Sequence, residues 1–179
     1  MNLYQTLKHY FGYDTLRPGQ QDLMEGILNG SDVLGIMPTG AGKSLCYQVP
    51  ALMLPGITNV IPPLISLMSD QVKALNQAGV HAAYINSSLT ENQIRAALLY
   101  AAQGQYKIIY VAPERLNTMR FLDFACRADI SMVTVDEAHC ISQWGQDFRP
   151  SYLEIADFLA RLPRLSLIHI SEPTRRRGI

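Results

Sequence analysis

Residues 37–44, Met-Pro-Thr-Gly-Ala-Gly-Lys-Ser, constrain the fold more strongly than any other stretch of the sequence. An apolar run at 32–36 precedes them and a helix-like stretch at 45–54 follows, which predicts the order strand, loop, helix. In a loop of this kind, glycines let backbone N–H groups turn inward around an anion, and the helix N-terminus adds positive potential. Lys43 and Ser44 stand where a phosphate-binding loop places a cation for phosphate and a hydroxyl for Mg²⁺.

The loop departs from the general phosphate-loop pattern at its first position. The pattern G-x-x-x-x-G-K-[ST] has a glycine where this chain has Met37, so the match is to the shorter core T-G-x-G-K-S. A glycine turn that merely precedes a helix is the alternative that the loop alone leaves open. The candidate phosphate-binding residues are Thr39, Gly40, Gly42, Lys43 and Ser44.

The rest of the chain alternates predicted strands and helices. The predicted strands after residues 32–36 cover 58–61, 80–85, 107–111 and 131–135, and the predicted helices cover 2–11, 18–30, 43–53, 64–79, 90–103 and 119–128. Nearly continuous apolar runs are typical of strands buried on both faces, and alternation with helices favours right-handed crossovers. The sequence therefore predicts an α/β fold with a parallel sheet and helices on both faces.

Composition and charge exclude several classes of protein. A length of 179 residues with 48% hydrophobic side chains indicates a globular chain of about one domain. The formal net charge is zero, so any nucleic acid would be held by local contacts rather than by a basic surface. No run approaches the ~18 apolar residues of a membrane-spanning helix, so we expect no membrane partner.

The three cysteines, Cys46, Cys126 and Cys140, are widely spaced and form no C-x-x-C pair. This spacing argues against a zinc site and against a disulfide framework. We therefore expect a cytoplasmic protein in a reducing compartment.

A second polar motif, Asp136-Glu137-Ala138-His139, follows the predicted strand at 131–135. In open α/β sheets, ligands bind beyond the carboxyl ends of the strands, so this motif and the loop at 37–44 are expected to share one edge of the sheet. One carboxylate there can hold Mg²⁺ and its neighbour can orient or deprotonate an attacking water. The alternative is a pair of surface acids that simply end a strand.

Together, these motifs resemble those of superfamily 2 helicases, and specifically the RecQ family of DNA helicases, over residues 3–164. The stretches that carry the resemblance are FGYDTLRPGQ at 11–20, MPTGAGKSLCYQ at 37–48, PLISLMSDQ at 63–71, IYVAPERL at 109–116 and DEAHCISQWGQDFRP at 136–150. The resemblance implies a RecA-like P-loop NTPase lobe. For the parent protein it implies ATP-dependent 3′–5′ unwinding of DNA in repair and recombination, with ATP and Mg²⁺ as cofactors.

The resemblance also implies roles for residues outside the loop. Tyr13, Arg17 and Gln20 match an adenine-recognition motif, in which an aromatic ring and a guanidinium sandwich the base and the amide reads its edge. By spacing alone, Tyr13 as a core residue and Arg17 as a solvated charge at a helix start would be an equal alternative.

Further matches concern phosphate and metal binding, hydrolysis and its coupling to movement. Lys43 matches the phosphate-binding lysine, and Ser44 and Asp136 match the pair that holds Mg²⁺. Glu137 matches the acid that activates water, and His139 matches a residue that links the nucleotide site to movement. Standing alone, His139 would more often be a hydrogen-bonded structural histidine.

Residues 143–150 match an aromatic-rich loop that senses single-stranded DNA in the family. Trp144 and Phe148 offer stacking faces, Arg149 offers a phosphate or cation–π contact, and Gln143 opens the loop. Two positions depart from the family pattern. Pro62 stands where serine is usual and removes a backbone donor at a strand end, and Gln146 stands where histidine is common.

The C-terminal stretch departs from the family altogether. A family member should continue past Pro163 into another buried strand and then a second lobe, which supplies an arginine that stabilises the transferred phosphoryl group. Residues 165–179 instead begin LSLIHISEPTR and resemble the translation of a sequencing-library adapter. We expect residues 1–164 to be the first lobe, the tail to be non-native, and the chain to be inactive alone.

Two other functions stay open on the sequence. An RNA helicase of superfamily 2 shares the Asp-Glu-Ala-His chemistry, although the loop at 143–150 disfavours it. A non-catalytic nucleotide- or DNA-binding fragment is the second alternative.

Overall fold

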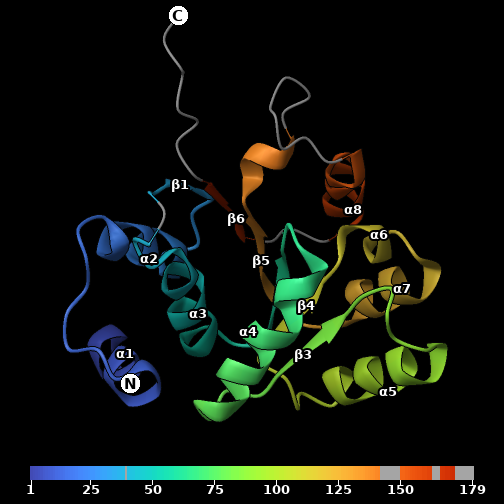
Figure 1. The fold of residues 1–179 in the computed structure, drawn as a ribbon, viewed down its shortest axis with the longest axis horizontal. Helices are drawn as coiled ribbons and strands as arrows, with labels where there is room; N and C mark the ends of the chain where they lie inside the picture. Colours follow the sequence, from blue (N-terminus) through green and yellow to red (C-terminus); the bar gives the residue numbers. More distant parts are fainter. Residues whose placement is uncertain (39, 142–149, 163–165, 172–179) are drawn as a thin grey trace, which may run out of the picture.

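The computed structural model describes residues 1–38, 40–141, 150–162 and 166–171. Its strands form one parallel sheet in the order β1-β6-β5-β2-β4-β3. The strands are β1 (Val33–Ile36), β2 (Ile57–Ile61), β3 (Ala82–Ile85), β4 (Ile108–Val111), β5 (Ile130–Asp136) and β6 (Ser166–Ser171). The predicted α/β architecture is confirmed (Figure 1).

Helices connect these strands. They are α1 (Leu3–Phe11), α2 (Gln20–Leu28), α3 (Lys43–Met53), α4 (Ile65–Gln77), α5 (Glu91–Ala102), α6 (Pro113–Leu116), α7 (Met119–Arg127) and α8 (Glu154–Arg161), with 3₁₀ turns η1 (Ala138–Ile141) and η2 (Pro150–Leu153). Among the described residues, no helix is both long and apolar enough to cross a membrane.

Local sequence signals explain the start of α5 but misplace the start of α2. Thr90 caps α5 through the capping box predicted from Thr90 and Gln93, in which each side chain bonds the other's backbone N–H. The predicted start of α2 at Pro18 is wrong by two residues. Gly19 adopts a left-handed conformation with φ of 81° and acts as the N-cap, so the helix begins at Gln20.

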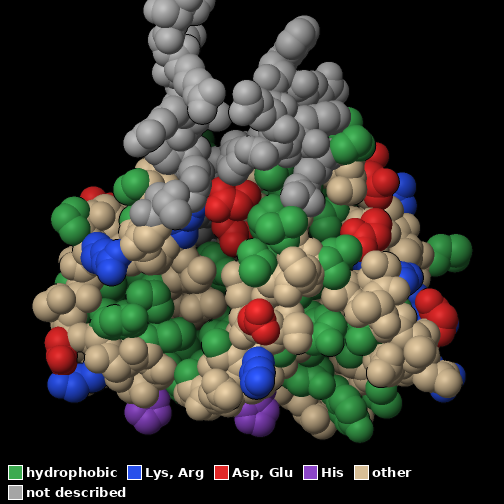
Figure 2. Space-filling model, viewed as in Figure 1, with side chains coloured by type: hydrophobic (Ala, Val, Ile, Leu, Met, Phe, Trp, Pro, Cys, Tyr) green, Lys and Arg blue, Asp and Glu red, His purple; other side chains and the backbone are tan. Residues whose placement is uncertain are grey.

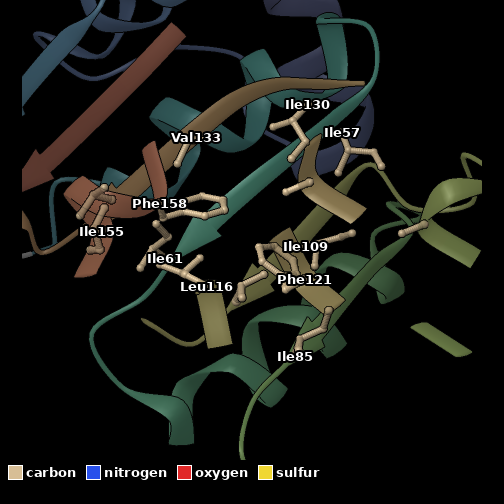
Figure 3. Close-up of a cluster of buried hydrophobic side chains, with 14 of the residues drawn as sticks. Ile57, Ile61, Ile85, Ile109, Leu116, Phe121, Ile130, Val133, Ile155 and Phe158 are labelled. Atoms are coloured by element: carbon tan, nitrogen blue, oxygen red, sulfur yellow. The ribbon is translucent and has the colours of Figure 1, made fainter. Parts of the chain in front are cut away.

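The larger hydrophobic core lies on the sheet face covered by α5, α6, α7 and α8. Ile61, Ile109 and Val133 point from the central strands toward Phe121 of α7 and Phe158 of α8 (Figure 3). The two phenylalanine ring centroids are 5.7 Å apart. Interdigitated apolar side chains of this kind fix the packing of helices on a sheet.

The second core lies on the opposite face, beneath α2, α3 and α4. Met68 of α4, Tyr47 of α3 and Ile27 of α2 are fully buried there against Val60 and Tyr110 of the sheet. Helices therefore cover both faces, as the alternation of strands and helices predicts.

One polar side chain interrupts the larger core. Asn59 is 2% exposed on β2 and pairs with Ile109 of β4 and Val133 of β5. Its side-chain nitrogen and oxygen are both buried without a hydrogen-bond partner. A buried amide in this condition costs free energy of folding.

Two features of the sheet bear on the sequence expectations. Pro62 does not disturb the strand before it, because Ile61 still pairs with Val135. The sheet also extends beyond residue 164, since β6 lies between β1 and β5 and pairs with both.

Candidate nucleotide-binding site

The phosphate-type loop joins β1 to α3, as the sequence predicts. Gly42 is the N-cap of α3 with φ of 79°, and Gly40 has φ of 77°. Left-handed backbone at both positions favours glycine. A Cβ at Gly42 would also lie 2.6 Å from Nε2 of Gln20, so a side chain there would displace the Gln20 amide from the loop carbonyls.

Gln20 and Arg17 hold this loop from the side of α2. The Gln20 amide nitrogen donates to the carbonyl oxygens of Ala41 and Gly42, both at 3.1 Å, and its oxygen accepts from the Arg17 N–H at 2.8 Å. The Arg17 guanidinium donates to the carbonyl of Gly40. Because Gln20 is 2% exposed, its own three bonds are partly shielded from water, whereas the bond from Arg17 to Gly40 is exposed.

Of the three proposed adenine-recognition residues, Arg17 and Gln20 therefore contact the loop directly. Tyr13 is 55% exposed, so its interpretation as a core residue is wrong. Arg17 bonds the loop, which sets aside the alternative of a purely solvated charge.

The acidic motif follows β5 at the same edge of the sheet. Asp136 ends β5 and is 9% exposed, and its Oδ1 accepts from the Glu137 N–H at 3.0 Å. The hydroxyl of Tyr152 donates to the Asp136 carbonyl at 3.0 Å. These bonds fix the end of the strand.

Glu137 has an unusual backbone. Its φ is 53°, and it is the one non-glycine with positive φ among the described residues. Such a conformation is costly for most side chains and is often found at functional sites. In it, the Glu137 carboxylate reaches the loop, where Oε1 lies 2.8 Å from Lys43 Nζ.

The Lys43–Glu137 pair joins two motifs that are 94 residues apart. The Lys43 and Glu137 side chains are 13% and 21% exposed, so the pair is partly shielded from solvent. This contact confirms the prediction that the loop at 37–44 and the motif at 136–139 lie at the same edge of the sheet.

A buried hydroxyl network beneath the loop was missed by the sequence reasoning. The Tyr47 hydroxyl lies 3.3 Å from the Tyr110 hydroxyl. Gln48 Nε2 donates to Tyr110 at 3.3 Å. Burial raises the pKa of both Tyr47 and Tyr110, so both stay neutral at physiological pH.

The residues present fit a divalent cation held together with a phosphate. In the described part of the chain, no cluster of three or more His, Cys, Asp or Glu forms a metal site by itself. Mg²⁺ takes oxygen ligands and often uses only one or two from protein, with water and phosphate completing the shell. Ser44 and Asp136 offer a hydroxyl and a carboxylate of this type at one edge of the sheet.

Several predicted residues have no described side-chain geometry. Thr39, Gln143, Trp144, Phe148 and Arg149 lie outside the described residues. His139 is placed only as part of the η1 backbone. The predicted DNA-coupling loop thus stays a prediction.

On the face seen in Figure 2, the charged side chains of the described residues are scattered and of both signs, and they form no large patch of one sign. This distribution agrees with the zero net charge of the chain.

Comparison with known proteins identifies the family. The sequence pattern of DEAD/DEAH box helicases matches residues 17–172. The chain belongs to the DEAD/DEAH box helicase family. The matched segment of this helicase domain contains the loop at 37–44 and the motif at 136–139.

Two curated relatives are similar over most of the chain. The ATP-dependent DNA helicase RecQ of Bacillus subtilis is 51% identical over 150 residues, which cover 83% of this chain and 25% of the relative. The protein of the same name from Haemophilus influenzae is 46% identical over 157 residues, which cover 88% of this chain and 25% of that relative. The chain spans about a quarter of the length of these relatives.

A solved structure agrees in fold. The DUF1998 helicase MrfA, bound to DNA and AMPPNP, aligns with a TM-score of 0.73 at 16% identity, over 98% of this chain and 26% of that one. At this identity the likeness shows the fold alone.

Proposed function

We propose that residues 1–164 are the ATP-binding lobe of a RecQ-type DNA helicase, which in its parent protein couples ATP hydrolysis to 3′–5′ unwinding of DNA in repair and recombination. The observation that carries the proposal is the meeting of Lys43 and Glu137 at the edge of a parallel sheet. It supports a site where a phosphate-binding cation and a water-activating acid act on the same nucleotide.

The proposed roles follow the geometry. The N–H groups of Gly40 and Gly42 and the Lys43 ammonium would bind phosphate, with the start of α3 adding positive potential. Ser44 and Asp136 would hold Mg²⁺, which neutralises phosphate charge when bound. Glu137 would orient and deprotonate the attacking water.

The adenine end of the nucleotide would lie beside α2. Gln20 is held there by the loop carbonyls and Arg17 by Gly40, which would link the proposed base recognition to the phosphate loop. Tyr13 is exposed and free to stack on a base. His139 is proposed to relay the state of the nucleotide, and Gln143, Trp144, Phe148 and Arg149 to sense DNA.

We infer that the 179-residue chain does not work alone. An arginine finger is worth on the order of 10³–10⁵ in rate, and a helicase of this type draws it from a second lobe. Translocation also needs two lobes that close and open. The chain should therefore show no DNA-stimulated ATPase above a Lys43→Ala control.

A chimera tests the proposed activity. Residues 1–164 would replace the matching quarter of the Bacillus subtilis relative, and ATPase would be measured with and without single-stranded DNA. We expect DNA-stimulated turnover and duplex unwinding that Lys43→Ala abolishes. A folded chimera with no stimulated ATPase would contradict the proposal.

The same chimera separates the alternatives. Equal or stronger stimulation by RNA would favour an RNA helicase. Nucleotide binding without turnover, in a chimera whose unmodified parent is active, would favour a non-catalytic binding module.

We also propose that residues 165–179 are not native sequence, because they resemble a translated library adapter. Resequencing the locus across the codon for Leu165 decides the matter. An intact downstream helicase frame would support the proposal, and a genuine stop after Ile179 would contradict it.

A further inference from the structure

The side chain of Tyr152 joins η2 to the end of β5. Its hydroxyl donates to the Asp136 carbonyl at 3.0 Å, across 16 residues of sequence. Tyr152 is 1% exposed and lies in the larger core with Val135, Ile155 and Phe158. Because a closely packed core leaves an aromatic ring little freedom, the hydroxyl is held at one place.

The peptide group between Asp136 and Glu137 is hydrogen-bonded at both of its polar atoms. Its carbonyl accepts from Tyr152, and its N–H donates to the Asp136 Oδ1 at 3.0 Å. The next carbonyl, that of Glu137 itself, accepts from the Cys140 N–H at 2.9 Å. The backbone is therefore held on both sides of the Glu137 Cα.

These bonds surround a residue in a costly conformation. Glu137 has a φ of 53°, which a non-glycine residue keeps only where the surrounding structure imposes it. Two of the three bonds come from the same turn, at Asp136 and Cys140, whereas the bond from Tyr152 comes from a separate element. Tyr152 thus ties this turn to the packed core.

The direction of the Glu137 side chain depends on this backbone conformation. In the left-handed conformation, the Glu137 carboxylate lies 2.8 Å from Lys43 Nζ. A change of φ toward the ordinary region would swing the Cα–Cβ bond and carry the carboxylate away from that position.

We propose that Tyr152 is a positioning residue for Glu137, because its bond to the Asp136 carbonyl holds the turn that directs the Glu137 carboxylate to Lys43. The functional meaning of this inference rests on the proposed nucleotide site. Without the hydroxyl, Glu137 relaxes and pairs less well with Lys43, which leaves the ammonium more available to phosphate.

Two variants matched in chemistry test the proposal in the full 179-residue chain. Tyr152→Phe removes only the hydroxyl. Thr6→Val is the control, because the Thr6 hydroxyl also donates to a backbone carbonyl at 3.0 Å and Thr6 is 2% exposed, but it lies on α1. Each variant would be made alone and together with Glu137→Gln.

Two measurements would be made on every variant. Binding of N-methylanthraniloyl-ATP would be titrated in EDTA, so that the proposed metal-binding role of Asp136 does not contribute. Urea unfolding would give the midpoint of each variant without any nucleotide.

We expect Tyr152→Phe to tighten binding about 2- to 5-fold, within the range of one hydrogen bond, and Thr6→Val to leave it unchanged. In the Glu137→Gln background, Tyr152→Phe should give no further gain. The effects of Tyr152→Phe and Glu137→Gln on unfolding should be less than additive, whereas those of Thr6→Val and Glu137→Gln should add. A hydroxyl that only stabilises the fold would lower the urea midpoint and leave nucleotide affinity unchanged.

The outcomes separate this inference from the proposed nucleotide site. If the probe binds wild type better than Lys43→Ala, then unchanged or weaker binding by Tyr152→Phe overturns the inference alone. A further gain in the Glu137→Gln background overturns it too. If wild type binds no better than Lys43→Ala, the nucleotide site fails and the urea data decide, because additive effects of Tyr152→Phe and Glu137→Gln would show that Tyr152 does not position Glu137.

Discussion

The ammonium of Lys43 lies 2.8 Å from the carboxylate of Glu137, so the two charged groups proposed to act on ATP form an ion pair with each other. A phosphate bound in the loop as proposed would compete with Glu137 for the Lys43 ammonium. Partial burial strengthens this competition relative to a surface ion pair.

The first prediction is that Glu137→Gln tightens ATP binding. A neutral amide competes less well for Lys43, so we expect about a 2- to 10-fold gain in affinity, the range of one polar interaction, measured by fluorescence titration. Glu154→Gln, at an exposed position of α8, is the control and should have no effect. Unchanged or weaker binding by Glu137→Gln would show that the ion pair does not compete with phosphate.

The second prediction concerns the room at Gly42. Gly42→Ala adds a Cβ 2.6 Å from Gln20 at a φ of 79°, so it combines a steric clash with backbone strain. Gly12→Ala has a similar φ of 74° with open space and isolates the strain, which costs ~1–2 kcal/mol.

Urea unfolding compares these two glycine variants. Gly42→Ala should be the more destabilised, and adding Gln20→Ala should recover part of the difference. Equal losses for Gly42→Ala and Gly12→Ala would mean that the amide of Gln20 does not pack against the loop.

The third prediction is a stabilising variant. Asn59→Leu replaces a buried amide that lacks hydrogen bonds with an apolar side chain of similar size, so we expect the free energy of unfolding to rise by ~1–3 kcal/mol. Asn76→Leu is the opposite control, because Asn76 exchanges two hydrogen bonds with the Ala82 backbone and should be destabilised. Chemical denaturation measures both, and a destabilised Asn59→Leu would argue against this account of the core.

The fourth prediction concerns cysteine reactivity. Burial raises the pKa of the Cys46 thiol from 9.0 to about 11, whereas Cys126 is exposed. At pH 8 iodoacetamide should modify Cys126 quickly and Cys46 slowly. The reagent does not reach the buried Cys46, and little of that thiol is ionised to the reactive thiolate. Mass spectrometry of the digested protein gives the rates, with urea-unfolded protein as control. Similar native rates would contradict the burial of Cys46.

The raised pKa of the Cys46 thiol also makes the stability of the fold depend on pH. The folded state holds the Cys46 proton more tightly than the unfolded state does, so this group's contribution to stability is complete below pH 9 and falls as pH rises toward 11.

Local and periodic signals in the sequence predict much of this fold. Thr90 and Gln93 mark the start of α5, and Gly12 ends α1 in the left-handed conformation expected of a C-cap. The apolar run before Asp136 predicts β5, because a strand buried on both faces needs few polar residues.

The features that were missed depend on tertiary contacts. Helix α8 is held by Ile155 and Phe158 against the sheet, a relationship that the sequence pattern alone does not reveal. The left-handed conformation of Glu137 is stabilised by surrounding structure against its own preference. The Tyr47 hydroxyl pairs with that of Tyr110, which is 63 residues away, so no local pattern in the sequence predicts this contact.

The central claim is that the loop at 37–44 binds the phosphates of ATP through Lys43. Isothermal titration of the 179-residue chain with Mg²⁺–ATP, beside Lys43→Ala of equal thermal stability, tests it most directly. We predict weak binding by wild type and at least a tenfold loss, about 1.4 kcal/mol, in the variant. Equal affinity of the two proteins would contradict the account.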